Sequence, residues 1–227
     1  MAPPLKKKEM RRNPLAEWVG TVARFVELHR TAIMAGGIAA VVILGAAGAY
    51  WWYWVHQGQL ASAALADAEQ VLRTETPGAP ANADEAMKRL AAVARDYRGT
   101  ESAEEALIRL GNLQYDVGKM DEAQKTYEDY LKTYPRGRFI LIAAIGQAYV
   151  DDSKGNYQAG VETLSGALDN AKNSPLAGEA YSELARLYEA MKKPQDAIRV
   201  YSQIVEQYGQ TYWAQQAQQR LALLRSK

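Results

Sequence analysis

The chain has 227 residues, of which 48% are hydrophobic and 23% charged, a balance that suits one globular domain plus an extra apolar segment and excludes a disordered chain. The formal net charge of +1 argues against a broad basic surface, so no nucleic-acid partner is expected. Because the chain has no cysteine and only His29 and His56, we expect no disulfide, metal site or catalytic triad.

Residues 1–30 form a basic segment, with seven Lys or Arg and three Glu, whereas residues 56–227 carry 20 basic and 23 acidic side chains. The basic residues are Lys6, Lys7, Lys8, Arg11, Arg12, Arg24 and Arg30. After Pro14, apolar residues recur at helical spacing: Leu15, Trp18, Val19, Val22, Phe25 and Val26. Two interpretations stay open for this segment. One is an amphipathic helix on the lipid of the cytoplasmic leaflet, and the other is a solvated tail whose charge sets topology.

Residues 31–55 contain no charged side chain, which is enough helix to cross about 30 Å of hydrocarbon. The segment ends in an aromatic run that suits the headgroup region, formed by Tyr50, Trp51, Trp52, Tyr53 and Trp54. The positive charge before the segment places the N-terminus in the cytoplasm, by the positive-inside rule. We therefore expect a single-pass protein of the cytoplasmic membrane whose residues 56–227 lie outside the cytoplasm.

Two further questions concern the apolar segment. Gly48 and Ala49 would suit a signal-peptide cleavage site, but a segment this long behind about 30 preceding residues favours a retained anchor. Ala32, Gly36 and Ala40 form a ladder of small residues that would let a partner helix approach closely in the bilayer. The alternative is that the ladder only reflects the usual composition of membrane helices.

Beyond the apolar segment, residues 37 positions apart match repeatedly from Asp84 to Ala222. The matching columns of one helix are Ala86, Ala123, Gly160, Ala197; Leu90, Tyr127, Leu164, Tyr201; Ala94, Leu131, Leu168, Val205; and Tyr97, Tyr134, Tyr208. Those of a second helix are Ala106, Ala143, Ala180, Ala217, and Gly111, Ala148, Ala185, Ala222. Each repeat is therefore predicted to be a pair of antiparallel helices that buries its apolar face only by stacking on its neighbours.

Turn-forming residues divide the repeats into helices. Gly118, Gly155 and Lys192 share a column at the tight turn within a pair. We expect helix 56–73 to pair with helix 83–97 across a loop around Pro77 and Pro80. Three further pairs are expected at 101–134, 138–171 and 175–208. A polar-faced capping helix is expected at about 212–225. Only Gly58 interrupts the pattern between Val55 and Arg73, so the first repeat helix is expected to continue directly from the membrane helix. The predicted fold class is all-α.

The repeat between Glu104 and Pro135 resembles the tetratricopeptide-repeat family. The residues that carry the resemblance are Leu110, Gly111, Tyr115, Gly118, Ala123, Tyr127 and Pro135. The period of 37 exceeds the usual 34 and is similar to that of longer repeats in bacterial envelope proteins. The resemblance implies an α-solenoid of about four helix pairs.

The resemblance also implies a partner-binding groove on the concave face, lined by the first helix of each pair. The candidate residues are Glu105, Ile108, Asn112, Tyr115, Asp116, Ile145, Tyr149, Ser182, Arg186 and Glu189. Family members that clamp a C-terminal carboxylate use Lys and Asn there, and Ile108 and Ile145 occupy the Lys column. Such a clamp is therefore not expected, and an extended peptide or a partner helix suits the groove better.

No phosphate loop, nucleophile elbow, zinc-ligand spacing or kinase motif occurs, so neither a cofactor nor enzymatic activity is expected. Asp151 and Asp152 are adjacent and are interpreted as a solvated patch near a turn rather than as an acid–base pair.

The whole layout resembles the ancillary subunit of the bacterial Sec translocon. The resemblance implies a membrane-anchored adaptor whose partners are translocon subunits, exported proteins or periplasmic chaperones. The alternative is a structural scaffold for envelope assembly or cell division, since similarly long repeats occur in such proteins.

Overall fold

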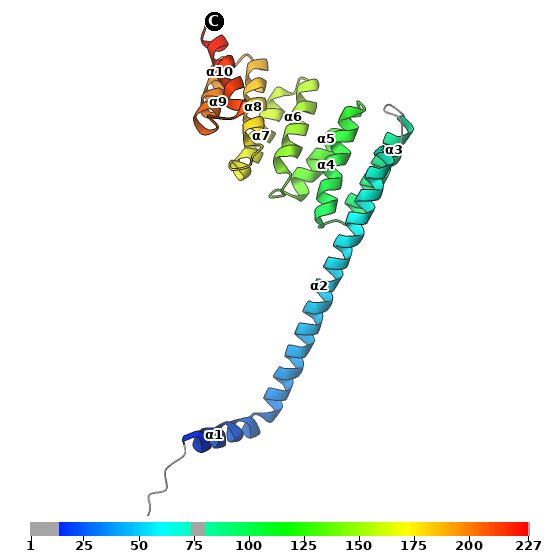
Figure 1. Cartoon of the computed structure of the whole chain (residues 1–227), viewed down its shortest axis with the longest axis vertical. Coiled ribbons are helices and arrows are strands. Elements are labelled where there is room, and N and C mark those ends of the chain that lie inside the picture. Colours follow the sequence, from blue (N-terminus) through cyan, green and yellow to red (C-terminus); the bar gives the residue numbers. More distant parts are fainter. Residues whose placement is uncertain (1–13, 74–79, 227) are drawn as a thin grey trace, which may run out of the picture. The chain divides into compact units, whose positions relative to one another are not determined.

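The structure is a computed structural model that describes residues 14–73 and 80–226, and these residues contain ten α-helices and no strand (Figure 1). The basic run Lys6–Arg12 and Pro77 lie outside the described residues. The chain divides into two compact units, residues 1–55 and 56–227.

The first unit contains helix α1 (Pro14–Leu28) and the N-terminal part of helix α2 (Arg30–Arg73). Helix α2 is long and apolar enough to cross a membrane, with a mean hydropathy of 2.1 over 18 residues, none of which is buried. The aromatic residues from Tyr50 to Trp54 are all exposed. Between Trp18 and Val55, the apolar side chains therefore fill no protein core.

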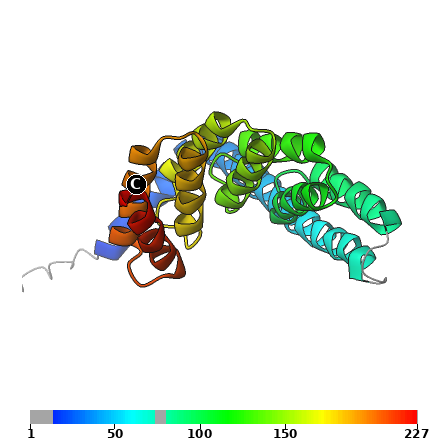
Figure 2. The same cartoon turned by 90° about the horizontal axis from the view of Figure 1, so that it is seen from above.

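The second unit is a row of helix pairs, in which each helix packs on the next in chain order (Figures 1 and 2). Its helices are the C-terminal part of α2 with α3 (Pro80–Asp96), α4 (Glu101–Asp116) with α5 (Met120–Thr133), α6 (Ile140–Ser153) with α7 (Tyr157–Ala171), α8 (Ala177–Ala190) with α9 (Pro194–Gln207), and α10 (Tyr212–Arg225). The first helices of successive pairs, α4, α6, α8 and α10, also contact one another. The predicted all-α solenoid is confirmed within the described residues.

Helix α3 begins earlier than predicted. It starts at Pro80, whereas the sequence prediction placed Pro80 in the loop and began the helix at Ala83. Proline suits the first helical turn because its missing N–H would have no partner there, and its fixed φ already matches the helix. The prediction treated this proline as a breaker when it is an initiator.

The small-residue columns allow the helices to approach closely. Ala106, Ala143, Ala180 and Ala217 are completely buried. At Gly111 a Cβ would lie 2.6 Å from Cε1 of Tyr127, which is itself fully buried on the second helix of the same pair. Small residues on one helix thus make room for large ones on its partner, which is the physical basis of the repeat.

The turns after α4, α6 and α8 each use a residue with positive φ: 81° at Gly118, 75° at Gly155 and 57° at Lys192. Each is the C′ residue of a Schellman motif, in which the next residue donates its N–H back across the turn. Lys119 donates to the carbonyl of Gln114 and Asn156 to that of Asp151, at 2.8 and 2.7 Å. The predicted turn column is therefore one backbone motif used three times.

Candidate binding groove on the first helices

The first part of the candidate groove is a pocket of about 450 Å³ between α4, α6 and α8. Its lining is Asn112, Tyr115, Asp116, Tyr127, Ile142, Ile145, Gly146, Tyr149, Leu176 and Glu179. The Tyr115 and Tyr149 rings lie 6.4 Å apart and come from successive first helices. The pocket therefore offers aromatic and aliphatic walls with polar groups at its edges.

The second part is a pocket of about 360 Å³ between α6, α8 and α10. Its lining is Tyr149, Glu179, Ser182, Glu183, Arg186, Tyr201, Tyr212, Trp213, Gln216 and Arg220. Tyr149 and Glu179 line both pockets. The two pockets are therefore adjacent parts of one groove that follows the first helices from α4 to α10.

Seven of the predicted groove residues line these pockets: Asn112, Tyr115, Asp116, Ile145, Tyr149, Ser182 and Arg186. The other three do not. Ile108 is buried in the core with Tyr127, and Glu105 pairs with Arg109 at 2.6 Å. Glu189 lies behind the lining, where it accepts a 2.8 Å hydrogen bond from the Tyr201 hydroxyl and pairs with Arg220.

Three of the four charged groups that line the second pocket are neutralised by ion pairs: Arg186 and Glu183 pair with each other, and Arg220 pairs with Glu189. Arg186 pairs with Glu183 at 2.6 Å and with Asp152 at 2.9 Å. The hydrogen bond from Arg186 to Glu183 is the main cause that raises the Arg186 pKa, so the guanidinium stays charged. Burial raises the pKa of Tyr149, with the nearby Glu183 adding to the effect, so its hydroxyl stays protonated and can donate.

The first pocket has two carboxylates without such neutralisation. Asp116 and Glu179 form no ion pair with any described residue. Their charge lies at the edges of a pocket whose walls include Tyr115 and Ile145. This part of the groove is therefore apolar and acidic.

Helix α10 contributes more to the groove than the sequence indicated. It was predicted as a polar-faced cap, yet Tyr212, Trp213 and Arg220 line the second pocket. Gly178 makes room for the indole, since a Cβ there would lie 2.8 Å from Trp213 Cδ1. The 37-residue period contained the signal, because Gln216 corresponds to Glu179 and so α10 takes the place of a fifth first helix.

The prediction that Asp151 is solvated was wrong. Its side chain is 1% exposed, and its Oδ2 has no hydrogen-bond partner among the described residues. Burial raises its pKa, and the nearby Glu128 raises it further. Position 151 corresponds to the buried Gln114 one repeat earlier, so the column faces inward, whereas Asp152 faces Arg186.

The fold and this groove define a helical-repeat protein built to bind other proteins. The sequence profile of the family described as a Tetratricopeptide repeat-like domain matches residues 24–174, and a second, described as a Tetratricopeptide repeat, matches residues 145–211. The chain belongs to the tetratricopeptide repeat-like family. Proteins with this repeat serve as scaffolds for protein–protein interaction.

Solved structures support the same fold. MamA from Desulfovibrio magneticus RS-1 is 17% identical, with a TM-score of 0.54 over 75% of this chain and 84% of that chain. A putative Podosopora anserina kinesin light chain with nearly identical TPR-like repeats is 19% identical, with a TM-score of 0.57 over 75% and 87%. A tetratricopeptide repeat protein from Parabacteroides merdae is 17% identical, with a TM-score of 0.57 over 74% and 61%. No curated protein sequence matches this chain.

Proposed function

We propose that this protein is a membrane-anchored adaptor that binds an extended segment of another protein in the groove along α4, α6, α8 and α10. The observation that carries the proposal is the continuity of the two pockets through Tyr149 and Glu179. An elongated groove with aromatic walls suits a peptide chain, because alternate side chains can enter successive pockets.

Membrane anchorage by residues 31–55 is the second part of the proposal. The support is the apolar helix α2, none of whose hydrophobic window is buried, followed by the exposed aromatic run at Tyr50–Trp54. Exposed apolar surface of this extent is costly in water and favourable in lipid. The basic residues that precede it support a cytoplasmic N-terminus.

Helix α1 is proposed to lie on the cytoplasmic leaflet beside the anchor. Its large apolar residues from Trp18 to Val26 fall on one arc and are exposed, with Trp18 at 67% and Phe25 at 58%. Arg24 and Glu27 fall on the opposite arc of the helix. An exposed apolar stripe next to a membrane-crossing helix suits the interface between headgroups and acyl chains.

Single cysteines test the position of α1, because the chain has none of its own. In inverted membrane vesicles, we expect Val22→Cys to react at least fivefold more slowly with a membrane-impermeant maleimide than Glu27→Cys. Dissolving the vesicles in denaturing detergent should abolish the difference. Equal rates in intact vesicles would show that α1 is a solvated helix.

Photo-crosslinking in cells tests the groove. A photoreactive amino acid at Tyr115 or Tyr149 should give adducts with partner proteins, whereas one at the exposed Glu162 on α7 should give few. Equal yields at all three positions would contradict the groove as the binding surface. Translocon subunits, exported proteins or periplasmic chaperones are the partners we propose.

Purification from mild detergent, followed by mass spectrometry, tests the translocon partner directly. Consistent absence of translocon subunits would contradict that partner while leaving the groove proposal intact. A fluorescent fusion distinguishes the division scaffold, since midcell enrichment would favour it and an even peripheral signal would favour the translocon adaptor.

A further inference from the structure

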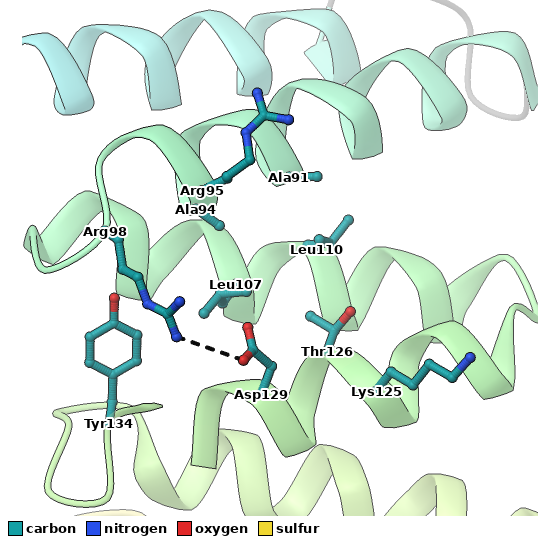
Figure 3. A pocket seen from close by; sticks show the side chains of 10 residues that line it. All are labelled: Ala91, Ala94, Arg95, Arg98, Leu107, Leu110, Lys125, Thr126, Asp129 and Tyr134. Atoms are coloured by element: carbon teal, nitrogen blue, oxygen red, sulfur yellow. Dashed lines mark ion pairs between the residues drawn. The ribbon is translucent and has the colours of Figure 1, made fainter. Parts of the chain in front are cut away.

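A third pocket lies on the second helices, away from the groove. It has a volume of about 330 Å³ and is formed by α3, α4, α5 and the turns that follow α3 and α5 (Figure 3). Its lining is Ala91, Ala94, Arg95, Arg98, Leu107, Leu110, Lys125, Thr126, Asp129 and Tyr134. None of these residues lines the groove, so this pocket is a separate surface of the same domain.

The pocket exists because one repeat column has a short side chain here. Ala94 occupies the column that holds Leu131, Leu168 and Val205 in the later repeats. Those three larger side chains pack against the core of the domain. At Ala94 the corresponding volume is left open between α3 and α5, and Leu107 and Leu110 supply apolar walls.

The rim of the pocket is positively charged. Arg95, Arg98 and Lys125 line it with one carboxylate, Asp129 (Figure 3). Arg95 also pairs at 2.7 Å with Asp96, which lies outside the lining, so the three basic groups exceed the nearby carboxylates by one. Arg98 donates a 2.8 Å hydrogen bond to Thr133 Oγ1 and lies 4.0 Å from Asp129, while Lys125 forms no ion pair with a described residue. Basic groups around an apolar hollow favour an acidic partner that carries a large apolar side chain.

We propose that this pocket binds an acidic protein segment, one of whose leucine-like or phenylalanine-like side chains takes the space that leucine fills in the later repeats. The carboxylates of that segment meet Arg95, Arg98 and Lys125. The domain would then have two binding surfaces of opposite charge, a basic one on its second helices and an acidic one in the groove around Asp116 and Glu179.

Restoring the repeat residue tests the proposal. The probe is a fluorescein-labelled peptide, Glu-Asp-Glu-Leu-Asp-Glu, titrated with the full-length protein in detergent and followed by anisotropy. We expect binding that weakens at least tenfold in Ala94→Leu, which fills the hollow with the side chain native to this column. The thermal midpoint of the variant, measured alongside, should equal or exceed that of the wild type.

Two lysines of α5, one inside the pocket and one outside it, supply a matched comparison. Lys125→Ser should weaken the peptide about fivefold, whereas Lys132→Ser, an exposed lysine of the same helix outside the pocket, should have little effect. Replacing the peptide leucine by serine should also abolish most binding. Tyr149→Ala, which alters the groove, should leave the peptide affinity unchanged. Failure of the pocket proposal can therefore be distinguished from failure of the groove proposal.

Three outcomes would overturn the proposal. The first is no binding of the peptide at millimolar concentration, and the second is unchanged affinity in a folded Ala94→Leu variant. The third is a dimer of the wild type that Ala94→Leu dissociates, since the occupant would then be a second copy of the chain.

Discussion

Asp151 shows at the scale of a single residue how a repeat column overrides local sequence. Two adjacent aspartates next to a turn favour a solvated patch, but the inward column places Asp151 in the core beside α5, near Glu128 and Lys154. A carboxyl whose pKa is raised on folding stabilises the fold while protonated, and this contribution is lost as the pH rises through the folded-state pKa. At neutral pH the buried carboxylate therefore costs stability.

Asp151→Asn should raise the free energy of unfolding at pH 7 by about 1 kcal/mol, because a neutral amide is less costly to bury than a carboxylate. The corresponding rise in Tm is about 2–4 °C. The gain should shrink as the pH is lowered from 7 towards 4, where the wild-type carboxyl becomes protonated. Asp152→Asn is the control and should destabilise slightly, because Asp152 pairs with Arg186; a lower Tm for Asp151→Asn at pH 7 would contradict the argument.

At the scale of the element, turns and tyrosines define the repeat. The turns after α4, α6 and α8 require a left-handed residue, and the third of them places Lys192 where the other two have glycine. The tyrosines that follow α5 and α9 bond to the preceding turn between pairs, whereas Ala171 occupies this column after α7. The Tyr134 hydroxyl accepts a 3.2 Å hydrogen bond from Gly99 N–H, and the Tyr208 hydroxyl donates a 3.0 Å bond to the carbonyl of Lys172.

Lys192→Gly should stabilise the domain by about 0.5–1 kcal/mol, because glycine adopts positive φ without the Cβ penalty and part of that gain is offset by entropy of the unfolded chain. The matched control is Gly155→Ala in the same column. A Cβ at Gly155 meets no atom within 4 Å, so its effect is purely conformational and should be destabilising by about 1 kcal/mol. The Tm of each variant, measured by thermal unfolding, tests both expectations. Equal changes in Tm of the same sign for the two variants would refute the explanation.

At the scale of the whole repeat domain, each helix pair is stabilised by its contacts with the adjacent pairs. Helices contact those next to them in the row, and contacts between more distant pairs are absent within the described residues. Charged side chains also link adjacent repeats, as in Lys119 with Asp84 at 2.7 Å and Lys154 with Asp121 at 2.6 Å. Such exposed pairs contribute little each, so apolar stacking carries most of the coupling.

Leu221→Ala tests this locality at the end of the row. Leu221 is buried on α10 against the core formed with α8 and α9, so its truncation should cost about 2–5 kcal/mol. Hydrogen exchange should quicken in α8, α9 and α10 and stay unchanged in α4 and α5. Leu223→Ala, at 55% exposed, is the control and should change neither region. Uniform acceleration across the domain would indicate a single cooperative unit instead.

The sequence alone determined the all-helical repeat, the pairing of its helices and its turns, because small and large residues that recur every 37 positions indicate which positions face a neighbouring helix. It also determined the apolar segment and the charge that precedes it, since both are properties of composition. Only the tertiary structure decided which groove candidates share a surface, that Ile108 is core, that α10 completes the groove, and that Asp151 is buried. Those facts depend on how successive helix pairs are oriented relative to one another. A repeat column shows that a position is equivalent to the same position in the other repeats, but it does not show whether a neighbouring helix covers that position.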